Sequence, residues 1–291
     1  MTWFVASRAG LTADELRSLD LSGWSPSWSL VGLSCLVLLA GYFGTGLLWG
    51  RIARGLGGPA LGPFVSIRLF MIANLGRYIP GKVWQIAGLA ALAKSRGMPA
   101  STATAAAVLG QGIALASATF IGLGSVWALA EGAAWRWAVP LALFGIVVVG
   151  LTPPVFRGVA GLWFRLARTD EPQGLRPSLA VGWLLFGLGT WIVYSTAFWL
   201  LVSGLGFSTA PLATASAFAA AYVLGYVMVF APAGIGVREG FLVALLSPQL
   251  GAPTAGAIAV AARLWTTLIE VVPAAAFWTQ HLTTNPGAPR E

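Results

Sequence analysis

Two short stretches of this sequence place charged side chains beside a break in an otherwise apolar segment. In the first stretch, at 74–84, Arg77 and Lys82 flank Pro80 and Gly81. Proline lacks a donor N–H and glycine tolerates any φ, so a helix stops here. In lipid, such a break survives only where protein or a watery cavity satisfies the freed backbone groups. The pattern predicts a site at membrane depth that holds an anionic group, such as a lipid phosphate, beside helix-terminal N–H groups.

The residues around the first break also have structural roles open to them. Arg77 and Lys82 are well placed to extend toward the cytoplasmic interface as topology anchors. Tyr78 and Trp84 either line the cavity or belong to the aromatic belt at the membrane surface. We include all of them in a candidate substrate-binding site, because anchoring alone does not account for the break.

The second stretch, at 232–240, has a similar break at Pro232 and Gly234 but adds both signs of charge. Arg238 and Glu239 follow the break directly. Adjacent residues on a helix do not face one another, so these two need not pair. Glu239 is either a proton or cation site or the salt-bridge partner of a basic residue from another segment, such as Lys82 or Arg263.

A later apolar segment contains Arg263 and Glu270 at a spacing that puts both on one helical face. Charges inside a membrane segment usually face the protein interior. They are either part of the substrate site or a buried structural pair with Glu239 or Arg238. Weaker polar candidates are Asn74 and Gln111.

The composition is that of an integral membrane protein. Of 291 residues, 57% are hydrophobic and 9% are charged, where a soluble domain has about 25% charge. One cysteine excludes an internal disulfide, and one histidine argues against a histidine-rich metal site or a Ser-His-Asp triad. We therefore expect no metal and no cofactor. The net charge of +8 sits mostly in short loops, which favours anionic lipid head groups over nucleic acid as partners.

The order of apolar and basic segments predicts a topology. Segment 28–50 is long enough to span, and Arg51 and Arg54 follow it, which places that end in the cytoplasm. Basic residues stand on both sides of 64–93, so we expect this segment to enter the membrane, turn at the break and return as a re-entrant hairpin. Two full passes are the alternative, although 83–93 is short for one.

The two halves of the chain also resemble each other. Short glycine motifs recur in the same order and at nearly constant spacing: Gly55-Leu56-Gly57 and Gly204-Leu205-Gly206, Leu75-Gly76 and Leu224-Gly225, Gly97-x-Pro99 and Gly251-x-Pro253. The topology predicts that the copies are inverted. Inverted repeats with broken helices near the midplane are typical of secondary transporters.

The predicted fold is an all-α polytopic membrane protein that contains an inverted repeat with two re-entrant broken-helix hairpins. We expect one transmembrane domain over residues 1–291. Its parts are repeat one at 28–129, a linking helix at 137–152, a basic cytoplasmic loop at 153–178 and repeat two at 179–278. A multi-pass protein of a bacterial inner membrane is the expected location, because no signal addresses an organelle.

The motif at 74–84, followed by Gly97-x-Pro99, resembles the first signature of the flippase-like transmembrane family, which is related to the membrane domain of lysylphosphatidylglycerol synthase. The stretch 232–240 is similar to the second signature, and Arg263 falls near a position where the family often has arginine. The resemblance implies a protein linked to moving lipids or lipid-linked sugars between leaflets. Larger members add an aminoacyl-transferase domain, which we do not expect here, so the resemblance does not imply synthase activity. Members often begin with another hydrophobic helix, of which residues 1–7 would be a remnant, and often have an acidic residue where Gln111 stands.

The leading hypothesis is a lipid transporter or flippase for an anionic phospholipid or lipid-linked sugar. Arg77, Lys82 and Arg238 would neutralise the phosphate in a cavity between the hairpins, while Glu239 and Glu270 would balance charge or couple to protons. Because the first break is basic and the second adds an acid, we expect the head group to lie nearer the first hairpin. The acyl chains would remain in the bilayer.

Two alternatives of other classes remain. The first is a membrane-embedded enzyme or glycosyltransferase accessory that acts on polyprenyl-phosphate lipids, although Glu239 and Glu270 are the only acids at depth to serve an acid-base mechanism. The second is a non-catalytic scaffold whose charges hold helices together. A homo-oligomer or a glycosyltransferase partner is compatible with either. The expectation is a transporter rather than an enzyme.

Overall fold

The computed structural model describes four long ranges of the chain. These are residues 25–79, 83–129, 177–227 and 236–284, together with the single residues 158, 161 and 165. The expected linking helix at 137–152 and almost all of the basic loop lie outside the described residues.

Every regular element in the described ranges is helical. In chain order they are α3 (Trp28–Gly55), α4 (Pro63–Asn74), the 3-10 helix η1 (Leu75–Tyr78), α5 (Trp84–Lys94), α6 (Ala100–Leu129), α9 (Pro177–Gly204), α10 (Pro211–Val227), α11 (Val237–Leu250) and α12 (Ala252–Thr284). Pro63 and Pro211 stand at the first position of their helices, where a missing N–H leaves no bond unmade.

Four of the described helices are long and apolar enough to cross a membrane. They are α3, most of α6, α9 and most of α12, with mean hydropathies between 1.5 and 1.9. A helix needs about 20 predominantly apolar residues to span the hydrocarbon core. Each of these spans is at least 26 residues long. The prediction of an all-helical, multi-pass membrane protein is therefore confirmed.

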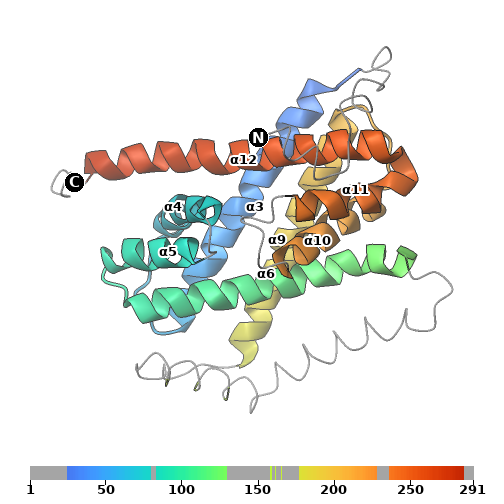
Figure 1. The fold of residues 1–291 in the computed structure, drawn as a ribbon. Coiled ribbons are helices and arrows are strands. Elements are labelled where there is room, and N and C mark those ends of the chain that lie inside the picture. Colours follow the sequence, from blue (N-terminus) through green and yellow to red (C-terminus); the bar gives the residue numbers. More distant parts are fainter. Residues whose placement is uncertain are drawn as a thin grey trace.

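The long helices pack in opposite directions. The N–H of Ser27, just before α3, donates to the carbonyl of Gly204 at the end of α9, at 2.7 Å. At the other end of α3, Gly55 lies against Trp183 near the start of α9. Figure 1 shows that α6 and α12 likewise run in opposite directions, with α4 and α5 toward one end of the molecule and α10 and α11 toward the other.

Two apolar clusters fill the interior. One is built around α3, α4, α5 and α6, and the other around α9, α10, α11 and α12, with α3 contributing to both. Phe198 and Phe218 stack within the second cluster with ring centroids 4.6 Å apart.

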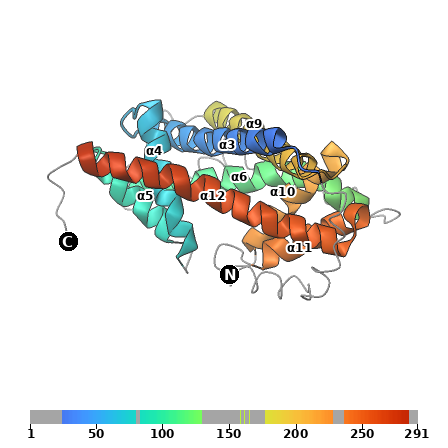
Figure 2. The same ribbon diagram turned by 90° about the horizontal axis from the view of Figure 1, so that it is seen from above.

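Between lipid-exposed helices, close approach of small residues replaces the hydrophobic driving force. A Cβ added to Gly122 of α6 would lie 2.9 Å from the backbone of Ala220 in α10. Figure 2 shows α6 and α10 side by side from above.

One boundary differs from expectation. The sequence predicts a turn from Ser247 to Pro253, whereas α11 continues through Pro248 to Leu250. Proline inside a helix removes the hydrogen bond to the carbonyl four residues earlier, and here the helix continues for only two residues beyond Pro248. The chain turns instead at Gly251, whose φ of 76° is in the region that favours glycine.

Candidate functional site

A cavity of about 170 Å³ lies where the short helices α4, η1, α5, α10 and α11 meet the long helices. Every described helical segment contributes at least one residue to its lining. The volume is several times the roughly 30 Å³ that one water molecule occupies in the liquid. The cavity is therefore large enough for a small polar head group, and its walls come from segments far apart in the sequence.

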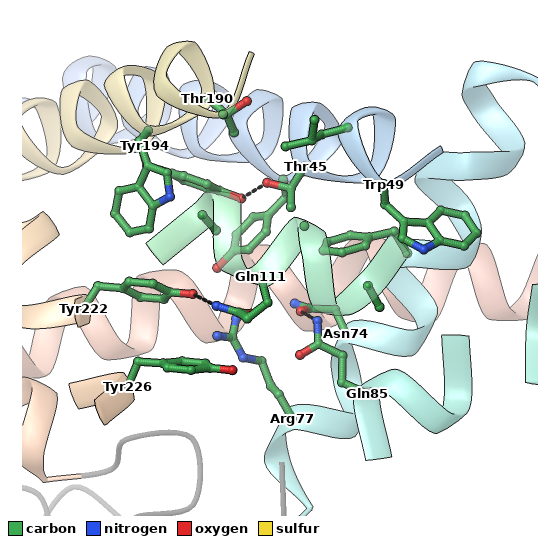
Figure 3. Close-up of a pocket in the computed structure, with 18 of the residues that line it drawn as sticks. Thr45, Trp49, Asn74, Arg77, Gln85, Gln111, Thr190, Tyr194, Tyr222 and Tyr226 are labelled. Atoms are coloured by element: carbon green, nitrogen blue, oxygen red, sulfur yellow. Dashed lines mark hydrogen bonds between the residues drawn. The ribbon is translucent and has the colours of Figure 1, made fainter. Parts of the chain in front are cut away.

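The lining combines cations, amides and aromatic hydroxyls. Its polar side chains are Arg77, Arg238, Asn74, Gln85, Gln111, Thr45, Thr190, Thr266, Tyr42, Tyr194, Tyr222 and Tyr226. In Figure 3, Asn74 and Gln85 lie on one side of Arg77, and Tyr222 and Tyr226 lie on the other. Within the described ranges, no carboxylate is among the lining residues.

The positive charge of Arg77 is balanced by Glu270, which is not among the cavity-lining residues. Its Nη1 lies 2.6 Å from Oε1 of Glu270, whose side chain is 4% exposed. The hydroxyls of Tyr42 and Tyr78 donate to the two oxygens of the same carboxylate. Three donors thus hold one buried acid, which is the condition under which a buried ion pair is stable. Glu270 thus pairs with Arg77 and not with Arg238, which was one of the partners left open from the sequence, because η1 directs Arg77 toward α12.

Arg238 has a different environment. Its guanidinium carbon lies 4.8 Å above the centre of the Phe218 ring, which is a cation–π contact. Among the residues that the structure describes, no carboxylate lies within ion-pair distance of it. Of these two lining arginines, one is therefore neutralised by a described acid and the other is not.

Glu239 does not reach the cavity. Its Oε2 accepts a hydrogen bond of 2.7 Å from the N–H of Gly236 and so caps the start of α11. Its Oε1 lies 3.7 Å from Nη1 of Arg263 in α12, and Arg263 also stands over the ring of Tyr78. The structural alternative for Glu239, a salt bridge to Arg263, is the one observed.

Hydrogen bonds between neutral side chains order the rest of the lining. Gln85 Nε2 donates to Asn74 Oδ1 at 3.0 Å across the first break. Gln111 Nε2 donates to the Tyr222 hydroxyl at 2.9 Å. These bonds connect α4 to α5 and α6 to α10, so the amides are held toward the cavity (Figure 3).

The predicted site residues fall into four groups. Arg77 and Arg238 line the cavity. A supporting layer outside the lining holds the ion pairs, and Trp84 is half exposed on the outer face. The supporting residues are Tyr78, Glu239, Arg263 and Glu270. Five predicted positions lie outside the described residues: Pro80, Gly81, Lys82, Pro232 and Gly234.

Sequence reasoning missed the tyrosines that line the cavity. The chain has five tyrosines; four line the cavity, and the fifth, Tyr78, bonds to Glu270. Tyr42, Tyr194 and Tyr222 lie well inside apolar helices, away from the interfacial belts where tyrosine is usually enriched. A tyrosine in mid-span, where its hydroxyl needs a partner, was the available signal.

The comparisons with known proteins identify the family. The family model described as the lysylphosphatidylglycerol synthase TM region matches residues 2–274. No curated protein and no solved structure matches the chain. The family match covers nearly the whole sequence and agrees with the motifs at the two breaks and with the helical, multi-pass architecture. The chain therefore belongs to the family of lysylphosphatidylglycerol synthase transmembrane regions.

Proposed function

We propose that this protein moves an anionic lipid between the leaflets of a bacterial inner membrane, with the head group bound in the cavity. The observation that supports this most directly is Arg238, a cation with no carboxylate partner among the described residues, in the wall of a cavity to which those residues contribute no acid. A buried cation without a counterion is costly, and an anionic ligand removes that cost.

An inverted repeat would supply the two conformations that transport needs. The long helices α3 and α9 end in the same glycine turn. The N–H of Gly57 donates to the carbonyl of Arg54, and that of Gly206 to Ser203, at 3.1 and 3.0 Å. The φ values are 83° and 88°. Each turn is followed by a short helix that begins with proline, and a second short helix comes later in the chain.

The antiparallel packing is what a two-fold relation between the halves would produce. Thr45 Oγ1 and the Tyr194 hydroxyl are 2.9 Å apart, although they are 149 residues apart in sequence. The same spacing separates Gly57 from Gly206. A residue that touches its own repeat equivalent lies near the two-fold axis, which we place where α3 crosses α9. Transport would occur by rocking one half against the other about this axis.

The two hairpins have equivalent tight crossings. A Cβ on Gly76 would lie 2.7 Å from the backbone of Gln85, and a Cβ on Gly225 would lie 2.8 Å from Arg238. In both hairpins the first short helix ends beside the start of the second. We propose that both are re-entrant, since α4 and α5, with 12 and 11 residues, are too short to span separately.

The proposed binding mode differs between the hairpins. Arg238 makes the direct contact with the phosphate, because its charge is available. Arg77 contributes hydrogen-bond donors, but the carboxylate of Glu270 offsets the positive charge of Arg77. We therefore place the phosphate nearer the second hairpin, opposite to the arrangement expected from the motif charges. The acyl chains stay outside the cavity, whose volume suits a head group alone.

The test is a leaflet-distribution assay on purified protein in liposomes that contain a fluorescent phosphatidylglycerol. We expect the protein to accelerate lipid exchange and Arg238→Gln to slow it about tenfold or more, because a charge-assisted hydrogen bond is worth about 1.5–3 kcal/mol. Arg54→Gln is the matched control. It removes the same charge from an exposed position away from the cavity, and we expect no change.

Three outcomes would contradict the proposal. The first is a folded wild-type protein that leaves the lipid distribution unchanged. The second is Arg238→Gln acting no more strongly than Arg54→Gln. The third is chemical conversion of the labelled lipid by the purified protein, followed by mass spectrometry, which would favour the enzyme alternative.

A further inference from the structure

The side chains of Asn74 and Gln85 form an amide pair at the first break. Asn74 is 2% exposed at the end of α4, and Gln85 lies in the first turn of α5. Gln85 Nε2 donates to Asn74 Oδ1 at 3.0 Å. Both side chains line the cavity, and Figure 3 shows them pointing toward the same space as Gln111.

This pair has unused hydrogen-bonding groups. Asn74 Nδ2 is fully buried and has no hydrogen-bond partner in the described part of the chain. Leaving a buried donor unpaired costs about 1–3 kcal/mol, and most buried polar groups in proteins are satisfied. The single bond between the amides also leaves Gln85 Oε1 as an acceptor. The pair therefore retains an unpaired buried donor on Asn74 and an available acceptor on Gln85.

That combination selects among ligand groups. A phosphate oxygen of a diester only accepts hydrogen bonds, so it would leave the acceptor on Gln85 unused. A hydroxyl both donates and accepts, so one hydroxyl can accept from Asn74 Nδ2 and donate to Gln85 Oε1. Exchanging the oxygen and nitrogen of both amides would leave the same donor and acceptor available. The pair is complementary to a hydroxyl, whereas Arg238 is complementary to a phosphate.

We infer that Asn74 and Gln85 bind a hydroxyl group of a polyol or sugar phosphodiester head group and thereby determine which lipid the cavity accepts. This inference rests on the proposed function, since it assigns the second half of the same head group. A head group that ends at the phosphate would bind to Arg238 but would leave the amides unpaired. Discrimination built on such unpaired groups is strong, because the site loses its own buried hydrogen bonds.

Two lipids of equal charge test the inference. Dioleoyl phosphatidylglycerol has hydroxyls beyond the phosphate, and dioleoyl phosphatidylmethanol has none. We expect the wild-type protein in detergent to bind the first about tenfold more tightly, measured by native mass spectrometry titration. Gln85→Leu is expected to weaken phosphatidylglycerol binding about tenfold and to change phosphatidylmethanol binding less than about twofold. Asn74→Leu is a second variant with the same expected result. If Asn74→Leu fails to fold, Gln85→Leu alone tests the inference.

The control replaces an amide elsewhere. Gln249→Leu makes the same change at an exposed position of α11 outside the cavity, and we expect both lipids to bind as in the wild type. Equal wild-type affinity for both lipids, or an equal loss of both in Gln85→Leu, would overturn the inference. In either case Arg238→Gln separates the two claims. It should weaken both lipids, and if it weakens neither, the proposed function fails as well.

A last arm distinguishes a lipid from a soluble ester with the same chemistry. We expect sn-glycerol 3-phosphate not to displace phosphatidylglycerol at concentrations comparable to that of the lipid, because the acyl chains contribute to binding. Displacement at those concentrations would show that the cavity binds a free polyol phosphate and would overturn the lipid assignment.

Discussion

The two broken-helix regions have matching backbone crossings and different charge environments. At the first break, Arg77 extends to Glu270, which also accepts from Tyr42 and Tyr78. At the second break, Arg238 stands over the Phe218 ring with no acid within ion-pair distance among the described residues. The first region is a closed ion pair between segments, and the second is a cation exposed to the cavity.

The backbone shape of the two regions and their charge environments have different structural causes. In each region one glycine, Gly76 or Gly225, allows two short helical segments to approach closely. The charge depends on α12, which places Glu270 beside the first break and pairs Arg263 with Glu239 near the second. Two regions with the same close backbone crossing can therefore have different charge environments, one with a closed ion pair and one with a cation in the cavity wall.

The largest expected effect is on the first region. Glu270→Ala leaves the Arg77 charge and two tyrosine hydroxyls without their acceptor, so we expect the free energy of unfolding to fall by about 3 kcal/mol. Denaturant unfolding of the purified protein in detergent measures this. The double variant Arg77→Met with Glu270→Met should recover much of the loss, because no charge is then left unpaired. A loss below about 1 kcal/mol for Glu270→Ala would mean that the pair is not structural.

The glycine crossings give the next effect. We expect Gly76→Ala and Gly225→Ala each to lower the free energy of unfolding by about 2 kcal/mol, since the new methyl group would overlap with neighbouring atoms. Gly182→Ala in α9 is the control. No atom of the described residues lies within 4 Å of its added Cβ, and alanine favours a helix. If only one of the two crossings proves sensitive, the hairpins are not equivalent in shape.

A smaller effect is expected where the two halves meet. Tyr194→Phe removes the hydrogen bond of 2.9 Å to Thr45 and retains the ring that packs on Tyr42. We expect a loss of about 1 kcal/mol in the same unfolding assay, the typical net value of one neutral hydrogen bond. An unchanged stability would indicate that this contact does not hold α3 against α9.

The smallest effect on stability is expected for Arg238→Met. The variant loses a cation–π contact of about 0.5–1 kcal/mol and gains by no longer burying an unpaired charge. We expect the free energy of unfolding to stay within about 1 kcal/mol of the wild-type value, whereas Arg77→Met should lower it by about 3 kcal/mol. Two equally large losses would erase the distinction between the regions.

Much of the fold was predictable because its signals are local. The lengths of the apolar segments indicated which helices could span the membrane. Glycine marked where α3 and α9 end, and proline marked where α4 and α10 begin. The site was predictable only in part. Arg77 and Arg238 were identified because charge inside apolar sequence is rare. Tyr42 and Tyr194 were missed although their mid-span position was a signal, and the sequence around Gln85 does not mark it. The turn predicted after Leu246 was placed too early, because α11 continues through Pro248 and the chain turns only at Gly251.

The sequence by itself determined a helical, multi-pass membrane protein of a recognisable family with two glycine- and proline-marked breaks. Hydrophobic length and backbone chemistry act over a few residues, so they can be recognised without a structure. The tertiary structure decided which charges pair. Glu270 lies 193 residues from Arg77 in sequence, and only the packing of α12 against η1 brings them together. An ion pair depends on the distance between two side chains in space, and that distance cannot be predicted from the residues next to each of them in the sequence.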